Sequence, residues 1–303
     1  MIEKTYNQRH IDHLLKQDLT DLPAILIEGA KGVGKTETAK QFAKQVYNLD
    51  NDIERQLIKG NPIILLQGER PVLIDEWQKE PSVWSFVRHA VDDGLEEGSV
   101  ILTGSSIKVN HHVHSGAGRI IRMKMRPYTI EERQMSSHYI RISDLLLANT
   151  NTIQGKTSLT LSDYIDEIYK SGFPGIRERN ERARKRLIQS YIQNIIDHEF
   201  SENGFDILSP QSLYGWLKAY AASVGTETKL QTIIDAAMAN NLELPSRPTI
   251  NKYKEALNIL CITDEVEPFL SVGKVYQNLS KASKHFMLDP AIALAILDVD
   301  KEQ

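Results

Sequence analysis

The sequence contains a single cysteine, Cys261, so no disulfide bond can form within the chain. Such usage is typical of proteins in a reducing compartment, and the apolar run around Cys261 predicts a thiol packed in the core. An excess of either charge is also lacking, because 36 Lys and Arg face 40 Asp and Glu and the net charge is -4. This balance argues against a protein coated in nucleic acid and leaves room only for a local basic face.

Long hydrophobic runs are absent as well. No apolar stretch approaches the length that crosses a bilayer, and the N-terminus lacks the apolar core of a signal peptide. We therefore expect a cytoplasmic protein without a membrane partner. The chain has 303 residues, of which 41% are hydrophobic and 25% charged, so it can bury a substantial core. Its length predicts about two domains.

The strongest motif in the chain spans residues 29–36 and fits the phosphate-binding pattern G-x-x-x-x-G-K-[ST]. An apolar run precedes the motif and a helix-like stretch follows it, which is the strand, loop and helix context that the pattern requires. Backbone N–H groups of a glycine-rich loop can approach an anion closely, and the N-terminus of the following helix adds positive charge. We expect the phosphates of ATP or ADP to be bound by Gly29, Ala30, Lys31, Gly32, Val33, Gly34, Lys35 and Thr36.

Chemical roles within the site follow from residue type. The Lys35 ammonium is expected to bridge the β- and γ-phosphates, and the Thr36 hydroxyl to coordinate Mg²⁺. A second buried strand is predicted over 71–74 and ends in Asp75 and Glu76, at the edge of a parallel sheet where ligands bind. Asp75 would hold Mg²⁺ opposite Thr36, and Glu76 would polarise a water molecule aimed at the γ-phosphate. The alternative is that these two acids only cap a strand.

Two further strands complete the predicted sheet. One spans 100–104 and ends in small polar residues, of which Thr103 and Ser105 are candidates to touch the γ-phosphate or the attacking water. Ordinary turn chemistry is the alternative interpretation of these hydroxyl groups. The other strand runs from Arg119 to Met125, with Ile120 and Ile121 on opposite faces.

Five more segments accompany the phosphate loop in a fixed order: 72–78, 101–106, 115–119, 125–127 and 171–175. This order is similar to that of prokaryotic AAA+ superfamily ATPases that have a C-terminal domain of unknown function. The resemblance implies a sensor at Thr103 or Ser105 and an arginine finger at Arg119, with Arg122 or Arg126 as alternatives. It also implies that Pro174 packs a lid near the nucleotide. Such relatives often continue into a nuclease-like domain, whereas this chain ends at Gln303; it is either a short member or a truncation, and no nuclease activity is carried over to it.

Outside the sheet, most of the chain is predicted to be helical. Helices are expected over Tyr6–Gln17, from the phosphate loop to about Tyr47, and over Glu80–Asp93, Leu161–Lys170, Arg177–Phe200, Gln211–Ala222 and Lys229–Ala239, with a last one that opens within Pro245–Ile250 and runs through Leu260. The run at 63–66 fits either a short strand or the end of a helix. Basic residues crowd 177–186 and are interleaved with Glu178 and Glu181, which predicts a solvated helix face, with phosphate or nucleic-acid contact as the alternative.

After residue 209, three predicted helices are followed by short strands near 262–268, 274–276 and 285–288. This is the outline of a winged helix, whose third helix enters the major groove in DNA-binding versions. Here that helix offers Arg247, Asn251, Lys252 and Lys254, which are few charges, so we rank DNA contact below packing or protein binding.

The sequence thus predicts an α/β P-loop NTPase of AAA+ type in three parts: residues 1–150 bind nucleotide, 151–205 form a helical lid and connecting helix, and 206–303 form a winged-helix-like α+β domain. The expected function is Mg²⁺-dependent ATP hydrolysis coupled to conformational change or partner binding, in a homo-oligomer or with a partner protein. Two alternatives stay open. One is a slow nucleotide switch, and the other is a DNA-binding adaptor that acts through the C-terminal domain.

Overall fold

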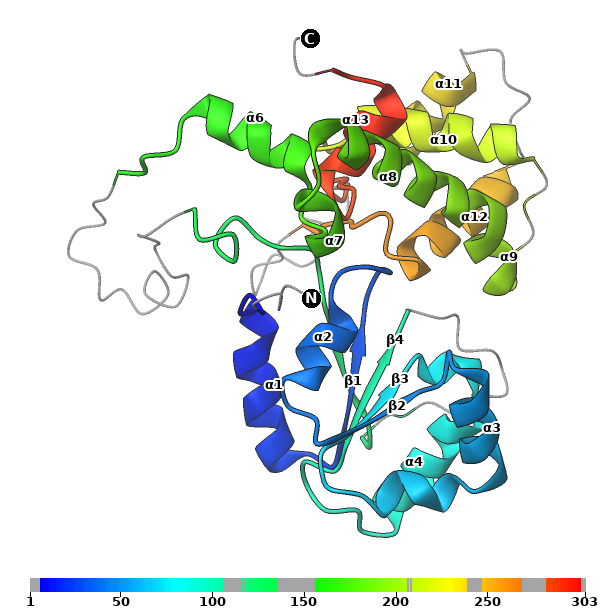
Figure 1. The fold of residues 1–303 in the computed structure, drawn as a ribbon. Coiled ribbons are helices and arrows are strands. Elements are labelled where there is room, and N and C mark those ends of the chain that lie inside the picture. The colour runs from blue at the N-terminus through cyan, green and yellow to red at the C-terminus, as the bar shows by residue number, and fades with distance from the viewer. Residues whose placement is uncertain are drawn as a thin grey trace, which may run out of the picture.

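A computed structural model of the chain describes residues 6–105, 116, 118–135, 156–205, 207, 209–238, 247–268 and 282–300. Its centre is a five-stranded parallel sheet in the order β2-β3-β4-β1-β5 (Figure 1). The strands are β1 (Ala24–Glu28), β2 (Gln45–Asn48), β3 (Val72–Asp75), β4 (Val100–Gly104) and β5 (Ile121–Lys124). The predicted parallel α/β sheet is therefore confirmed.

Burial along the strands follows their position in the sheet. The three central strands are aliphatic and buried almost throughout, whereas the outer strands β2 and β5 alternate or are largely exposed. Because successive side chains of a strand point to opposite faces of the sheet, the hydrophobic core is divided into two clusters. Ile25, Ile27 and Leu73 belong to one hydrophobic cluster, while their neighbours Leu26 and Ile74 belong to the cluster on the other face. Both faces of the sheet are thus covered, as parallel sheets require.

The helices of this first half are α1 (His10–Asp21), α2 (Lys35–Lys40), α3 (Asp52–Gly60) and α4 (Ser82–Asp92), with the 3₁₀ turns η1 (Pro62–Leu66) and η2 (Trp77–Lys79). The prediction of a helix from the phosphate loop to Tyr47 was wrong. The helix ends at Lys40, and the segment containing Tyr47 pairs with β3 as an edge strand. The run at 63–66 is part of η1, which has Pro62 in its first turn.

The second half of the chain is helical and lies beyond the carboxyl ends of the central strands (Figure 1). Its elements are α6 (Leu161–Lys170), α7 (Pro174–Arg177), α8 (Glu181–Asn194), η3 (Ile195–Glu199, a π-helical turn), α9 (Phe200–Glu202), α10 (Pro210–Ala222), α11 (Leu230–Met238), α12 (Arg247–Ile259) and α13 (Pro290–Leu297). The long helix predicted over 177–200 is therefore interrupted before α8, where Asn180 caps the helix through the Ala183 N–H. The last helix, α13, packs against α6, α8 and α10.

Some features of the predicted winged helix are present. The helices α10, α11 and α12 follow the expected order, and two antiparallel bridges, Thr263 with Met287 and Val266 with Lys284, follow them. The strand predicted at 274–276 lies outside the described residues, as does the proposed boundary between residues 150 and 151. The winged helix and the three domain boundaries stay predictions. None of the helices in the described part of the chain is both long and apolar enough to cross a membrane.

Candidate nucleotide-binding site

The predicted phosphate loop connects β1 to α2 at the carboxyl end of the sheet. Gly32 and Gly34 have φ angles of 81° and 106°, which are in the left-handed region that favours glycine. Gly29 has no room for a side chain, because a Cβ atom would lie 2.3 Å from the Met125 carbonyl oxygen and clash with it. The glycines are therefore needed for the shape of this loop.

The Lys35 side chain turns back into the loop. Its Nζ donates hydrogen bonds of 2.9 Å to the carbonyl oxygens of Gly29 and Ala30, and the residue is only 5% exposed. Burial lowers the pKa of Lys35, and the negative charge of Glu76 opposes that shift. The ammonium group is thus held at the inner rim of the loop, where an anion would meet it.

Three oxygen-bearing side chains converge beside Lys35. The hydroxyl groups of Thr36 and Thr103 both donate to Asp75 Oδ1, the first over 2.8 Å. Carboxylate and hydroxyl oxygens are the hard ligands that Mg²⁺ prefers, so this donor set fits the ion. Within the described ranges, no group of three or more His, Cys, Asp or Glu side chains could hold a metal alone. A magnesium ion here would be shared between Thr36, Asp75 and the phosphates of the nucleotide.

Glu76 follows β3 in a conformation that is unusual for its residue type. Its φ angle is 54°, and the residue is half-buried. Burial raises the pKa of the Glu76 carboxyl, and the Lys35 charge opposes this effect. The Gln78 side-chain amide donates a hydrogen bond to the same carboxylate. A strained backbone that presents a carboxyl with a raised pKa is typical of a functional position.

The two hydroxyl groups predicted as sensors have different surroundings. Thr103 is fully buried, and its hydroxyl group donates a hydrogen bond to Asp75, so it helps to position that carboxylate. The Ser105 Oγ is buried without a hydrogen-bond partner in the described structure, and Ser105 lines a cavity together with Lys31. Of the two, Ser105 is the hydroxyl with unused hydrogen-bonding capacity.

A cavity of about 1120 Å³ covers the phosphate loop between the sheet and the helical half. Pro174, which begins α7, lines it opposite Gly34 and Lys35, and the N-terminal segment contributes Tyr6 and Asn7. This volume is large enough for a nucleotide. The structure thus brings Pro174 and the phosphate loop together, as the resemblance implied.

For Arg9, which precedes the first strand, the sequence favours a surface group and leaves contact with the nucleotide as the alternative; the structure places Arg9 in the lining of this cavity. An arginine ahead of the first strand is usually a surface group, yet Arg9 is 5% exposed. Its guanidinium donates to the Val33 carbonyl over 2.9 Å, forms an ion pair with Glu132 over 3.1 Å and stacks on the Tyr128 ring. Arg9 therefore holds the phosphate loop in place through the Val33 carbonyl. No local sequence signal distinguishes it from a solvated arginine.

Two family models match the chain. Residues 21–134 match an AAA domain, and residues 161–303 match a domain of unknown function, DUF8612. The chain thus combines an AAA domain with a C-terminal domain of unknown function. No curated protein matches it.

Three solved structures are similar to this chain at low sequence identity. A Walker-type ATPase of Pyrococcus abyssi has a TM-score of 0.57 and is 16% identical, with 96% of each chain covered. A mutant of RuvB from Thermotoga maritima has a TM-score of 0.36 and is 16% identical, over 90% of this chain and 95% of that one. DnaA from Aquifex aeolicus, bound to AMPPCP, has a TM-score of 0.31 and is 17% identical, over 85% and 96%. Only the first likeness is close enough to support the fold.

The candidate arginine fingers Arg119 and Arg126 lie at opposite ends of β5. Arg119 precedes β5, which runs parallel to β1, so it lies toward the opposite end of the sheet from the loop. There it forms an ion pair with Asp92 of α4. Arg126 follows β5 and pairs with Asp264 of the C-terminal domain over 2.8 Å.

Proposed function

We propose that the protein binds ATP with Mg²⁺ and hydrolyses it, and that nucleotide state changes the position of the C-terminal domain. The observation that supports this most directly is the convergence of Lys35, Thr36, Asp75 and Glu76 at one edge of the sheet, under a cavity of nucleotide size. The AAA domain match and the shared fold agree with it.

Each side chain would then have a distinct task. Lys35 holds the β- and γ-phosphates, and Thr36 and Asp75 hold Mg²⁺, which when bound neutralises phosphate charge. Glu76 accepts a proton from the attacking water, for which a raised pKa is suited. Ser105 has an unpaired Oγ with which to orient the γ-phosphate or that water. Pro174 packs against the nucleotide from α7.

Arg119 would act across a subunit boundary in this proposal. A guanidinium that reaches the γ-phosphate oxygens stabilises the transition state more than the ground state. Because Arg119 lies toward the far end of its own sheet, only a neighbouring copy can present it to a phosphate loop. A homo-oligomer follows from this role.

The experiment that tests the function compares three proteins. Wild type should bind ATP with Mg²⁺ in calorimetry and release phosphate. Lys35→Ala should lose ATP binding, whereas Glu76→Gln should bind normally and lose turnover by about a hundredfold or more. Wild-type turnover in both variants would refute the site.

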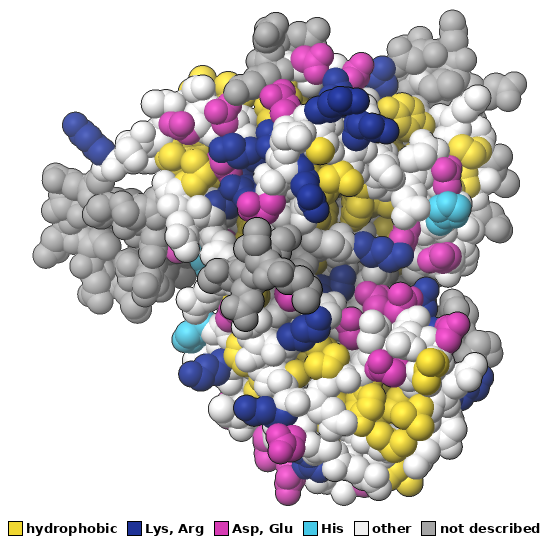
Figure 2. Space-filling view, in the orientation of Figure 1, with side chains coloured by type: hydrophobic (Ala, Val, Ile, Leu, Met, Phe, Trp, Pro, Cys, Tyr) yellow, Lys and Arg dark blue, Asp and Glu magenta, His cyan; other side chains and the backbone are white. Residues whose placement is uncertain are grey.

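A slow nucleotide switch is the second candidate, favoured by direct contacts between the phosphate loop and the C-terminal domain, such as that of Lys31 with Glu199. It predicts rare turnover and partner affinity that differs between ATP and ADP. A DNA-binding adaptor has weaker support. On α12, Arg247, Asn251 and Lys252 are exposed, but Lys254 is paired with Glu265 over 3.0 Å. Several Lys and Arg side chains also gather around α7 and α8 (Figure 2). A salt-dependent shift assay with duplex DNA tests this role.

A further inference from the structure

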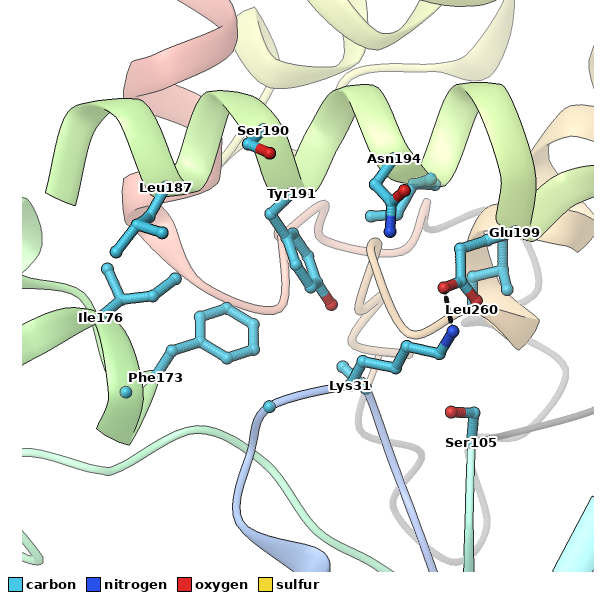
Figure 3. A pocket seen from close by; sticks show the side chains of 14 residues that line it. Lys31, Ser105, Phe173, Ile176, Leu187, Ser190, Tyr191, Asn194, Glu199 and Leu260 are labelled. Atoms are coloured by element: carbon cyan, nitrogen blue, oxygen red, sulfur yellow. Dashed lines mark ion pairs between the residues drawn. The ribbon is translucent and has the colours of Figure 1, made fainter. Parts of the chain in front are cut away.

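A second cavity, of about 480 Å³, lies between the phosphate loop and the helices α8 and η3. Figure 3 shows the Lys31 side chain rising from the loop and Glu199 descending from η3, with an ion pair between them. Ser105 lies at the edge of the same cavity. Two elements that are distant in the sequence therefore meet here through opposite charges.

The carboxylate of this pair is much more buried than the ammonium. The side chain of Glu199 is 8% exposed and that of Lys31 is 46% exposed. Among the residues that the structure describes, Lys31 is the only Lys or Arg that forms an ion pair with Glu199. Removing the partner of a buried charge is strongly destabilising. Glu199 therefore depends on Lys31 for its counter-charge.

The local structure of η3 directs Glu199 toward the loop. In a π-helical turn, residues five apart share one side, and Asn194 and Glu199 both line the cavity. Such turns are rare and occur often at functional sites. The backbone here thus adopts an uncommon conformation at the residue that meets the phosphate loop.

Lys31 lies at the end of the loop where a γ-phosphate would be. Lys35 Nζ, the predicted ligand of the β- and γ-phosphates, bonds to the carbonyl of Ala30, directly before Lys31. The charges of Glu76 and Glu199 both act on Lys31. The cavity of Glu199 is lined by Ser105 and shares Lys31 and Gly32 with the larger cavity, which Glu76 and the N-terminal segment line.

We propose that Glu199 makes the site discriminate against ATP relative to ADP, through its ion pair with Lys31. This inference rests on the proposed nucleotide binding. ADP leaves the pair intact, because it has no γ-phosphate. The γ-phosphate of ATP brings negative charge near the buried carboxylate and competes for the Lys31 ammonium. ATP, unlike ADP, therefore favours movement of η3 away from the loop.

The first test is Glu199→Gln in the full-length protein, with Mg²⁺ and either ADP or the non-hydrolysable ATP analogue AMPPCP as probes in calorimetry. Glutamine keeps the size of the side chain and removes its charge. AMPPCP affinity should rise about tenfold, equivalent to about 1.4 kcal/mol, while ADP affinity changes less than about twofold. Glu202→Gln is the matched control, since Glu202 is exposed and its charge acts on Lys31, but the two side chains do not form an ion pair. It should leave the ratio of the two affinities unchanged.

The second test uses the sign of the effect. Lys31→Met should lower AMPPCP affinity relative to ADP, the opposite of Glu199→Gln, and the double variant should lie between them. If the pair only fastened two parts of the protein together, both single variants would shift both nucleotides in the same direction. Equal shifts for AMPPCP and ADP in Glu199→Gln, or none, would overturn the inference and leave the proposed function standing. A wild type that binds neither nucleotide would overturn both.

Discussion

Asp289 connects the C-terminal helix α13 to the segment that precedes Pro174. Its Oδ2 accepts hydrogen bonds from the Gly172 N–H over 2.6 Å and from the Ser171 hydroxyl over 3.0 Å. Its Oδ1 caps α13 by accepting from the Ala291 N–H over 2.9 Å. Ser171 has a φ angle of 67°, so these contacts hold a backbone that would otherwise relax. Asp289→Asn should therefore weaken the contacts that hold residues 171–172 and preserve the N-terminal cap of α13.

The size of the effect follows from the lost bonds. An Asn side chain can still cap α13 through its oxygen, but its amide group cannot accept the Gly172 N–H. A buried donor left without a partner costs about 1–3 kcal/mol, and we expect the free energy of unfolding to fall by about 2 kcal/mol. If nucleotide binding requires Pro174 in place, a restraint of about this size limits the loss of ATP affinity to about thirtyfold.

The assay pairs urea unfolding of the nucleotide-free protein with calorimetric titration of AMPPCP. The control is Ser209→Ala, which removes the cap of α10 at a cost of about 1 kcal/mol and does not touch residues 171–174. It should leave AMPPCP affinity unchanged. The reasoning fails if Asp289→Asn is as stable as wild type, or if it loses stability and still binds AMPPCP with wild-type affinity.

Three further predictions concern charged groups. Burial raises the pKa of Glu76, and a general base must be unprotonated. Turnover should therefore fall as the pH drops through that raised pKa. A pH–rate profile that is flat down to the ordinary glutamate range would contradict this role of Glu76. Burial alone would raise the pKa of Glu167, but hydrogen bonds from Lys170 and Arg133 lower it to about 2. Roughly 3 kcal/mol of folding stability should therefore be present at a pH above the pKa of this group in the unfolded chain, and be lost as the pH falls toward 2. Glu167→Gln should abolish that part of the pH dependence in urea unfolding. Mixing inactive Arg119→Ala with inactive Lys35→Ala should restore part of the ATPase activity in trans, and no recovery from subunits shown to exchange would exclude a finger that acts between subunits.

The parts of the fold that the sequence predicted are those encoded by short, contiguous patterns. The phosphate loop needs glycines at fixed spacing, and buried parallel strands such as β3 read as aliphatic runs. The edge strand β2 was misread because its residues 45–48 follow a helix without a break in composition, and its strand conformation depends on pairing with β3. Propensity alone does not report such a partner.

The parts that the sequence missed depend on contacts between distant segments. Arg9 looks like any surface arginine until its partners Val33 and Glu132 are placed around it. Glu199 sits in what reads as the end of an ordinary helix, and only the π-helical turn and the position of Lys31 reveal its charge pairing. Roles that arise from long-range pairing have no local pattern by which to be recognised.

In the proposed function, a nucleotide signal would reach the C-terminal domain through the contacts between the two halves of the chain. Lys31 pairs with Glu199 at the phosphate loop, and Asp289 holds the backbone before Pro174 at the lid. Both contacts involve segments that a bound nucleotide would touch or approach. Next to them lies a hydrophobic cluster that is continuous from β1 to α13. Close-packed clusters transmit displacement because they do not deform gradually. A change at either contact is therefore expected to move the C-terminal helices as a unit, which is the mechanical requirement for coupling nucleotide state to a partner.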